Sequence, residues 1–172
     1  SIRGILQTAV TAANISVFDR SQRDPDLRGM GTTIVACIVC DGIAHIVHAG
    51  DSRAYHITTE GIEQMTKDHS VVQLLVDRGE ITQDEARFHP KKHFITRALG
   101  VMSIIDLDYC EFALDEGEAI IICTDGLSNY FTSGELFDMV KAAGYGKCVD
   151  KLINAAKKAG GADNITVVCI SK

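Results

Sequence analysis

Three aspartates stand beside glycines at points where a short apolar run begins or ends. Asp163 lies between a glycine pair and a β-branched run, Asp125 lies between an apolar run and a glycine, and Asp51 follows the glycine that ends another apolar run. Short apolar and β-branched runs are typical of strands, so each carboxylate is expected at a strand end. Carboxylate oxygens are the ligands that Mg²⁺ and Mn²⁺ prefer. A fold that brings the three strand ends together would therefore form a divalent-metal site.

Asp163 also fits a simpler structural role, and each aspartate alone is weak evidence for a metal site. The side chain of Asp163 or of Asn164 could satisfy a nearby backbone N–H in an Asx turn, which is far more common than a ligand aspartate. Gly126 gives a stronger signal, because a backbone turn next to a metal-bound Asp125 requires a residue without a Cβ atom. The turn and the metal site both remain open for any single position, and only the set of three favours the metal.

The hydrophobic pattern predicts an antiparallel fold. Asp41-Gly42 between two apolar runs is the strongest short signal for a hairpin, and Thr82 with Glu85 matches a capping box that opens a helix. The pattern predicts helices over residues 2–18, within 68–90, and over 133–142 and 146–159, and strands over 33–40, 43–47, 53–57, 105–113, 118–123 and 165–170. Strands in runs and helices in pairs indicate one α+β domain over 1–172. They argue against the parallel sheets of receiver domains and haloacid-dehalogenase-type phosphotransferases.

Composition excludes several functional classes. The chain has 172 residues, 46% hydrophobic and 23% charged, and its net charge of −6 provides no basic surface for nucleic acid or an anionic membrane. No apolar run approaches the ~20 residues of a membrane span, so a soluble protein is expected. Six cysteines, mostly inside apolar patterns, indicate a reducing cytoplasm. Cys37 and Cys40, like His45 and His48, lie three residues apart on expected strands, so their side chains point to opposite faces and cannot share a metal ion.

Six motifs span essentially the whole chain. They are RGMGTT (28–33), HAGDSRAY (48–55), TKDHS (66–70), TRALG (96–100), TDGL (124–127) and GGADNITVV (160–168). In order and spacing they resemble the protein phosphatase 2C family of metal-dependent serine/threonine phosphatases, and its bacterial branch most of all. The resemblance implies an antiparallel β-sandwich flanked by helix pairs, with a metal cluster at one end of the sandwich.

The resemblance also implies roles for individual residues. Asp125 and Asp163 correspond to two ligands of a core pair of Mn²⁺ or Mg²⁺ ions, and Asp51 corresponds to a ligand of an accessory third ion. Residues 68–97 are similar to a mobile flap over the active site. A metal-activated water would hydrolyse phosphoserine or phosphothreonine in proteins, so no side chain is expected to act as the nucleophile.

Two arginines are weaker site candidates. Arg97 would contact substrate from the end of the flap or pair with a carboxylate, and Arg53 would support the site electrostatically or form a salt bridge. Histidines in such a segment are mostly solvated, so His69, together with the two other histidines of the flap, is left outside the predicted site.

The chain departs from the family pattern at its start. Family members carry an Asn-Glu-Asp segment and an Asp-Gly-x-Gly-Gly segment ahead of the first long helix, and neither occurs before the first helix here. The fold is therefore expected to be incomplete at the N-terminus, and this chain alone weakly active or inactive. A catalytically silent scaffold or binding module is the alternative to an enzyme. The expected partners are phosphorylated proteins and a bacterial Ser/Thr kinase that the enzyme opposes, and exposed sheet edges predict self-association.

Overall fold

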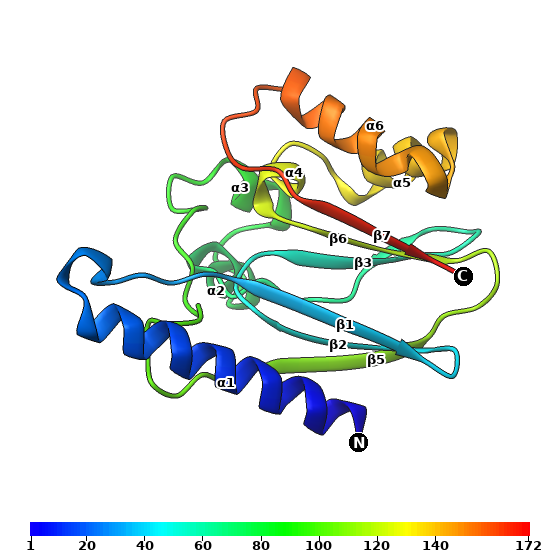
Figure 1. Ribbon diagram of the computed structural model, residues 1–172. Helices are drawn as coiled ribbons and strands as arrows, with labels where there is room; N and C mark the ends of the chain where they lie inside the picture. Colours follow the sequence, from blue (N-terminus) through cyan, green and yellow to red (C-terminus); the bar gives the residue numbers. More distant parts are fainter. The chain divides into compact units, whose positions relative to one another are not determined.

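The computed structural model describes all 172 residues, which form two compact units. Unit 1 comprises residues 1–51 and 68–112, and unit 2 comprises residues 52–67 and 113–172. In chain order the elements are α1 (Ile2–Arg23), η1 (Pro25–Leu27), β1 (Ile34–Cys40), β2 (Ile43–Ala49), β3 (Arg53–Ile57), β4 (Ile62–Gln64), α2 (Val71–Asp77), α3 (Gln83–Phe88), β5 (Asp108–Ala113), β6 (Ala119–Cys123), α4 (Asp125–Ser128), α5 (Ser133–Ala143), α6 (Tyr145–Lys158) and β7 (Val167–Ser171) (Figure 1). The α+β class with antiparallel sheets is confirmed, and the single domain over 1–172 stays a prediction.

A tight hairpin organises the three-stranded sheet of unit 1, whose strand order is β1-β2-β5. The backbone φ angles are 51° at Asp41 and 76° at Gly42. Two successive positive φ angles give the turn a twist that matches the twist of the flanking strands. The register that pairs Cys40 with Ile43 follows from this two-residue turn, and the predicted hairpin is confirmed.

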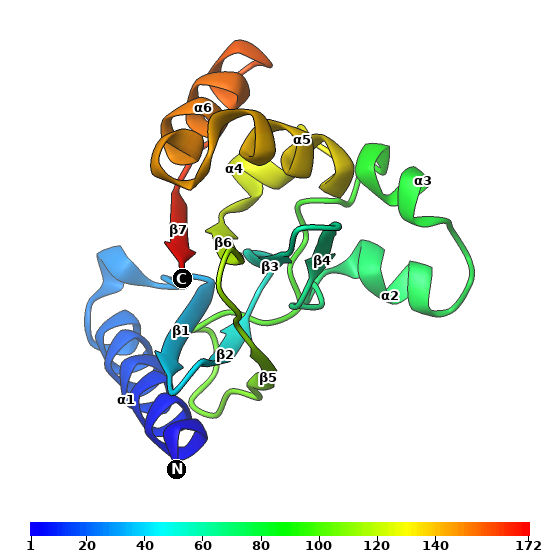
Figure 2. The same cartoon turned by 90° about the vertical axis from the view of Figure 1, so that its right-hand side faces the viewer.

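The first helix packs on this sheet through a short apolar stripe. Leu6 and Val10 are buried together with Val47 and Ala49 of β2, and Figure 2 shows α1 alongside β1 and β2. The helix has 22 residues and continues past the predicted end at residue 18. Neither α1 nor any other helix of the chain is long and apolar enough to cross a membrane.

A buried amide connects α1 to a loop far along the chain. Asn14 is fully buried, and its Nδ2 donates to the carbonyl oxygens of Met102 at 3.0 Å and Ser103 at 3.2 Å. Its Oδ1 accepts a hydrogen bond of 2.8 Å from the backbone N–H of Gly100. Because the side chain satisfies three backbone groups at once, it fixes the path of the loop against the helix.

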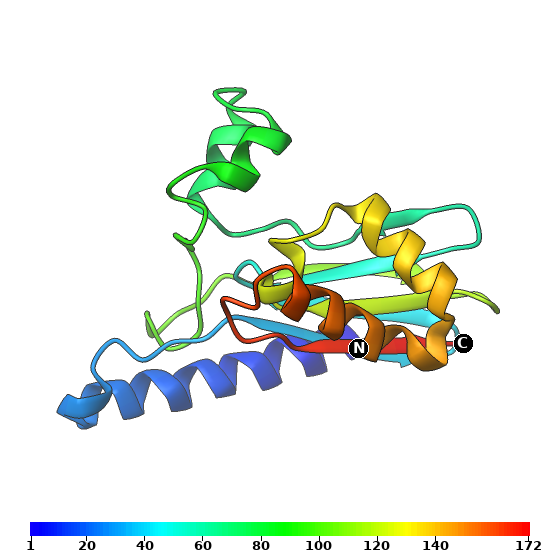
Figure 3. The ribbon, with the colours of Figure 1, turned by 90° about the horizontal axis from the view of Figure 1, so that it is seen from above.

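The segment predicted as a flap contains two short helices. Ser70 caps α2, Gly79 with a φ of 70° follows it, and the predicted capping box of Thr82 and Glu85 opens α3. Figure 3 shows α2 and α3 standing away from α1 and β1 of the same unit. The two ends of the segment meet in an isolated antiparallel bridge between Ser70 and Ile95.

Unit 2 is a four-stranded sheet with a helix pair on one face. The strand order is β4-β3-β6-β7, and α5 and α6 cover the sheet (Figures 1 and 2). The core between these layers includes Tyr55 and Ile121 from the sheet and Leu136 and Leu152 from the helices, all almost completely buried. The helix pair and three of these strands were predicted, whereas the short elements β4 and α4 were not.

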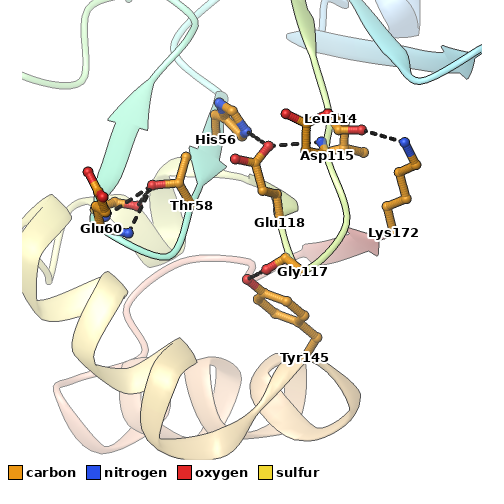
Figure 4. A network of polar contacts seen from close by, with 10 residues as sticks. His56, Thr58, Glu60, Leu114, Asp115, Gly117, Glu118, Tyr145 and Lys172 are labelled. Carbon is orange, nitrogen blue, oxygen red and sulfur yellow. Dashed lines mark hydrogen bonds and ion pairs between the residues drawn. The ribbon is translucent and has the colours of Figure 1, made fainter.

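A polar network lies where β6 begins (Figure 4). Oε2 of Glu118 lies 2.8 Å from Nε2 of His56 and accepts a 3.0 Å hydrogen bond from the backbone N–H of Asp115. The hydroxyl of Tyr145 on α6 donates to the carbonyl oxygen of Gly117 at 2.8 Å. These contacts tie the start of β6 to β3 and to the helix layer.

Candidate metal centre

Asp125 is the first residue of a short helix. Strand β6 ends at Cys123, Thr124 is the N-cap of α4, and Asp125 follows it. The half-buried carboxylate accepts a hydrogen bond of 3.0 Å at Oδ2 from Nδ2 of Asn129, one helical turn further on. The sequence predicted Asp125 at a strand exit, and the structure places the helix N-terminus there as well.

The loop that carries Asp163 lies directly against Thr124. The backbone N–H of Thr124 donates to the carbonyl oxygen of Thr166 at 3.2 Å, and the N–H of Thr166 donates to Oγ1 of Thr124 at 3.0 Å. Oγ1 of Thr124 also donates to the carbonyl oxygen of Asn164 at 3.2 Å. Residues next to Asp125 and next to Asp163 are therefore bonded to each other, because β6 and β7 pair antiparallel with Cys123 opposite Val167.

Gly126 explains how closely the two loops approach. A Cβ atom at this position would lie 2.2 Å from the carbonyl oxygen of Asn164 and 3.3 Å from Cγ1 of Ile165. No side chain fits there without moving the loop. Glycine is needed because of the neighbouring loop, and not because of its own backbone, since Gly126 lies in α4 and is not among the residues with a positive φ angle.

The donor chemistry of the two loops suits a hard divalent cation. The carboxylate of Asp125 is bonded to a neutral amide, and Oδ1 of Asp163 accepts only the N–H of the adjacent Asn164, at 2.7 Å. Neither carboxylate has a salt bridge to an arginine or lysine, so both charges remain to be balanced. Two carboxylates on adjacent loops fit Mn²⁺ or Mg²⁺, which bind oxygen ligands and retain several waters. The contact of Asp163 is with the next residue and not with the residue two positions on that an Asx turn requires, and the ligand role of Asp163 stays a prediction.

Asp51 belongs to unit 1, where it follows β2 and a turn that only glycine can adopt. Gly50 has a φ of 115°, and a Cβ atom there would lie 2.4 Å from Cγ2 of Thr33. The backbone N–H of Gly50 donates to Nδ1 of His69 at 3.1 Å. The role of Asp51 as a ligand of an accessory ion stays a prediction.

The two predicted arginines have side-chain partners. Arg53 is the first residue of β3, lies opposite Cys123 in the sheet, and donates from Nη1 to the hydroxyl of Tyr55 at 3.2 Å. Arg97 donates from Nη1 to Oδ1 of Asp108 at 2.7 Å, which is the carboxylate pair that the sequence offered as the alternative to substrate contact. Direct contact of either arginine with substrate stays a prediction.

His69 is the residue that sequence reasoning missed. It is 7% exposed, so the expectation of a solvated histidine is wrong at this position. Burial lowers the pKa of His69, and the hydrogen bond to Asp108 offsets that effect only in part. Burial would raise the pKa of Asp108, but hydrogen bonds from Arg97 and His69 outweigh it, and the pKa lies below its usual value. A signal was present, since His69 directly precedes the helix cap Ser70 inside the TKDHS motif.

The cysteines are poor candidates for a covalent phosphatase mechanism. All six are free. Burial raises the pKa of Cys37 to about 11, and burial together with the neighbouring Cys148 raises the pKa of Cys169 to about 12. The thiolate is the nucleophilic form of cysteine, so these two side chains are inert near neutral pH. The carboxylate loops remain the better candidate for the chemistry.

Comparison with known proteins identifies the family. The family model described as Protein phosphatase 2C matches residues 2–165. The Serine/threonine phosphatase stp of Listeria monocytogenes is 34% identical over 168 residues, which cover 97% of this chain and 67% of that protein. This chain therefore belongs to the protein phosphatase 2C family.

Solved structures agree with the assignment. The Mycobacterium tuberculosis serine/threonine phosphatase PstP/Ppp matches with a TM-score of 0.92 and 33% identity, over 99% of this chain and 72% of that one. The catalytic domain of PstP in complex with 2 manganese ions matches with a TM-score of 0.89 and 32% identity, over 98% and 70%. The predicted family and fold class are confirmed.

Proposed function

We propose that this chain carries the Mn²⁺- or Mg²⁺-dependent hydrolysis of phosphoserine and phosphothreonine in proteins. The observation that carries the proposal is the contact between the loops of Asp125 and Asp163, where Gly126 leaves space for the carbonyl group of Asn164. Two carboxylates without a protein cation stand on these loops. Membership of the protein phosphatase 2C family and relatives that are named serine/threonine phosphatases support the same function.

The proposed roles of the residues are those that the resemblance to the family implies. Asp125 and Asp163 would each offer carboxylate oxygens to a core pair of ions, and Asp51 would offer one to an accessory third ion. When bound, such cations lower the pKa of a water and neutralise charge on the transferring phosphoryl group. Asn129 holds the Asp125 carboxylate in one orientation through its amide, and Gly126 keeps the two loops in contact. No protein side chain is required as the nucleophile.

Residues 68–97 would act as the flap of this site. The segment begins beside the turn of Asp51, because the backbone of His69 donates to the carbonyl oxygen of Gly50 at 2.9 Å. Arg97 at its end would approach the substrate phosphate if its pair with Asp108 opened. Arg53 would add positive charge near the β6 exit, since it lies opposite Cys123 in the sheet.

The proposed substrates are phosphorylated proteins of a bacterial Ser/Thr kinase pathway. The kinase that adds these phosphates would be the functional counterpart of this enzyme, and the proposed location is the cytoplasm. The free cysteines are compatible with that reducing compartment.

We also propose that exposed sheet edges support self-association. Strand β7 ends the sheet of unit 2, and its Val168 is 45% exposed. An unpaired edge of this kind offers backbone donors and acceptors to a strand of another copy. Light scattering should show association that weakens in Val168→Lys, because a charged side chain disfavours edge pairing. Monomers at all concentrations would contradict this proposal.

The main test is an assay of the full-length protein on a phosphothreonine peptide. We expect turnover with Mn²⁺ or Mg²⁺ and none with a chelator, because the proposed nucleophile is a water that only the bound metal ion activates. A catalytically silent scaffold would bind the peptide without releasing phosphate. Binding of Mn²⁺ without any turnover would favour the scaffold and contradict the enzyme.

A further inference from the structure

A partly buried polar cluster joins the two ends of the flap segment 68–97. Nε2 of His69, at the start of the segment, lies 3.3 Å from Oδ2 of Asp108. Arg97, at its end, donates to the other oxygen of the same carboxylate at 2.7 Å. The ring of His48 stacks on the ring of His69 with a centroid distance of 4.7 Å and an interplanar angle of 10°. All four residues belong to unit 1.

The tautomer of His69 follows from its backbone partner. The N–H of Gly50 donates to Nδ1 at 3.1 Å, so Nδ1 carries no proton. The proton of the neutral ring must then be on Nε2, from which it is donated to Asp108. His69 and Gly50 are held by two hydrogen bonds, because the N–H of His69 donates in turn to the carbonyl oxygen of Gly50 at 2.9 Å.

A metal ion is the first alternative to consider for this cluster. The ligand atoms of His48, His69 and Asp108 all lie within 4.8 Å of one another, and two imidazoles with a carboxylate suit zinc or iron. A cation is already there, however, since Arg97 binds Asp108 and its Nη1 lies 3.1 Å from Nε2 of His69. A metal ion on Nε2 would also displace the proton from that nitrogen. Nδ1 could not take up the proton, because it accepts the hydrogen bond from Gly50. The guanidinium therefore takes the place of a metal.

The cluster lies beside the flap stem, which is the pair of backbone hydrogen bonds that joins the start of the flap segment to its end. The N–H of Val71 donates to the carbonyl oxygen of Phe94 at 2.9 Å, and the N–H of Thr96 donates to that of His69 at 2.8 Å. These bonds close the segment on itself next to Gly50. Thr33 packs against Gly50 and fills the space where a Cβ atom would lie, so the turn at Gly50 is also held by this contact.

We propose that His69 is a positioning residue for Asp51, which it holds through the backbone of Gly50, and that Asp108 and Arg97 fix the imidazole for this task. The inference rests on the proposed role of Asp51 as a ligand of an accessory divalent cation. Its consequence is that the flap stem and the Asp51 turn move as one piece. Loosening His69 releases both together, and cation binding at Asp51 weakens.

Two substitutions separate the two hydrogen bonds of the ring. In His69→Asn the amide oxygen takes the place of Nδ1 and can still accept from Gly50, but the side chain no longer reaches Asp108. In His69→Gln the longer side chain reaches Asp108 and no longer presents an acceptor to Gly50. His56→Gln is the matched control, because His56 also pairs with a carboxylate, that of Glu118 at 2.8 Å, in unit 2.

The experiment is a Mn²⁺ titration of the full-length protein by calorimetry, with amide hydrogen exchange at Gly50 as a second readout. We expect His69→Gln to weaken the accessory ion about 10-fold or more, as loss of a supporting hydrogen bond commonly does, and to speed exchange at Gly50. His69→Asn should recover most of both, and His56→Gln should change neither. Imidazole ¹⁵N shifts of the unmodified protein should show a neutral His69 with its proton on Nε2.

Asp51→Asn separates this proposal from the one on which it rests. If Asp51→Asn weakens the ion and His69→Gln does not, the positioning role is wrong while the ligand role stands. Equal losses in His69→Asn and His69→Gln would also overturn it, since the bond to Gly50 would then not be the route. If Asp51→Asn leaves Mn²⁺ binding unchanged, Asp51 is no ligand and both proposals are wrong.

Discussion

The Cα of Gly126 and the carbonyl oxygen of Asn164 approach so closely that an added Cβ atom would lie 2.2 Å from that oxygen. This contact joins the turn after β6 to the loop before β7, and each of them carries an acidic residue of the candidate metal centre. The contact is sensitive to a single methyl group, which makes it a good place to test the site.

Gly126→Ala is expected to destabilise the protein by about 1–3 kcal/mol, because overpacking forces the Asn164 loop to move. The same shift should weaken Mn²⁺ binding, since Asp163 moves with the loop. Denaturant unfolding and calorimetry measure the two effects. Gly134→Ala on α5 is the control, because a Cβ atom there has open space. Equal stability of the two variants would show that the loops are not in tight contact.

Asn14→Ala should destabilise the fold by about 1–3 kcal/mol, because it leaves the buried N–H of Gly100 and the carbonyl groups of residues 102 and 103 without their partner. Asn14→Asp should be at least as damaging at neutral pH, since it turns a carboxylate oxygen toward the carbonyl oxygens of Met102 and Ser103 at a fully buried position. Thermal or denaturant unfolding measures the change. Exposed Asn154 on α6 offers a neutral Asn→Ala control, and a similar small effect at both positions would refute the role of Asn14.

Glu118 should make stability depend on pH. The backbone N–H of Asp115 and then His56 lower the pKa of Glu118 below its ordinary value of 4.5. The ionised carboxylate therefore stabilises the folded state above that value, and the contribution is lost as the pH falls through the lower folded pKa. Glu118→Gln should be less stable than the unmodified protein at neutral pH, with a difference that shrinks in acid. Urea unfolding across this range tests it, with Glu116→Gln as an exposed control. A difference that stays constant into acid would contradict this role.

Elements with local signals could be predicted from the sequence, and these signals have local physical causes. Asp41-Gly42 predicted its hairpin because the turn itself demands positive φ angles, and Thr82 with Glu85 predicted a helix start because capping joins residues three apart. Helix α4 was missed because four residues cannot show a helical period. The helical range of α1 was underestimated because its last turn is polar and exposed apart from Ser21.

The acidic residues of the candidate site could be proposed from the sequence, whereas the contacts that hold their loops in place could not. Asp125 and Asp163 stand out by their position beside glycine and an apolar run. The contact of Gly126 with Asn164 depends on the pairing of β6 with β7, which composition does not reveal. His69 has partners 19 and 28 residues away at Gly50 and Arg97, so its burial follows from tertiary structure alone.

The most direct test of the account is a Mn²⁺ titration of the full-length protein and of its Asp125→Asn and Asp163→Asn variants, with Asp138→Asn on α5 as an exposed control. If the two aspartates share one centre, each single variant loses most Mn²⁺ affinity and phosphothreonine turnover while keeping its fold, and the double variant is hardly worse than either. Unchanged Mn²⁺ affinity in both single variants, with the fold intact, would contradict the assignment of the metal centre.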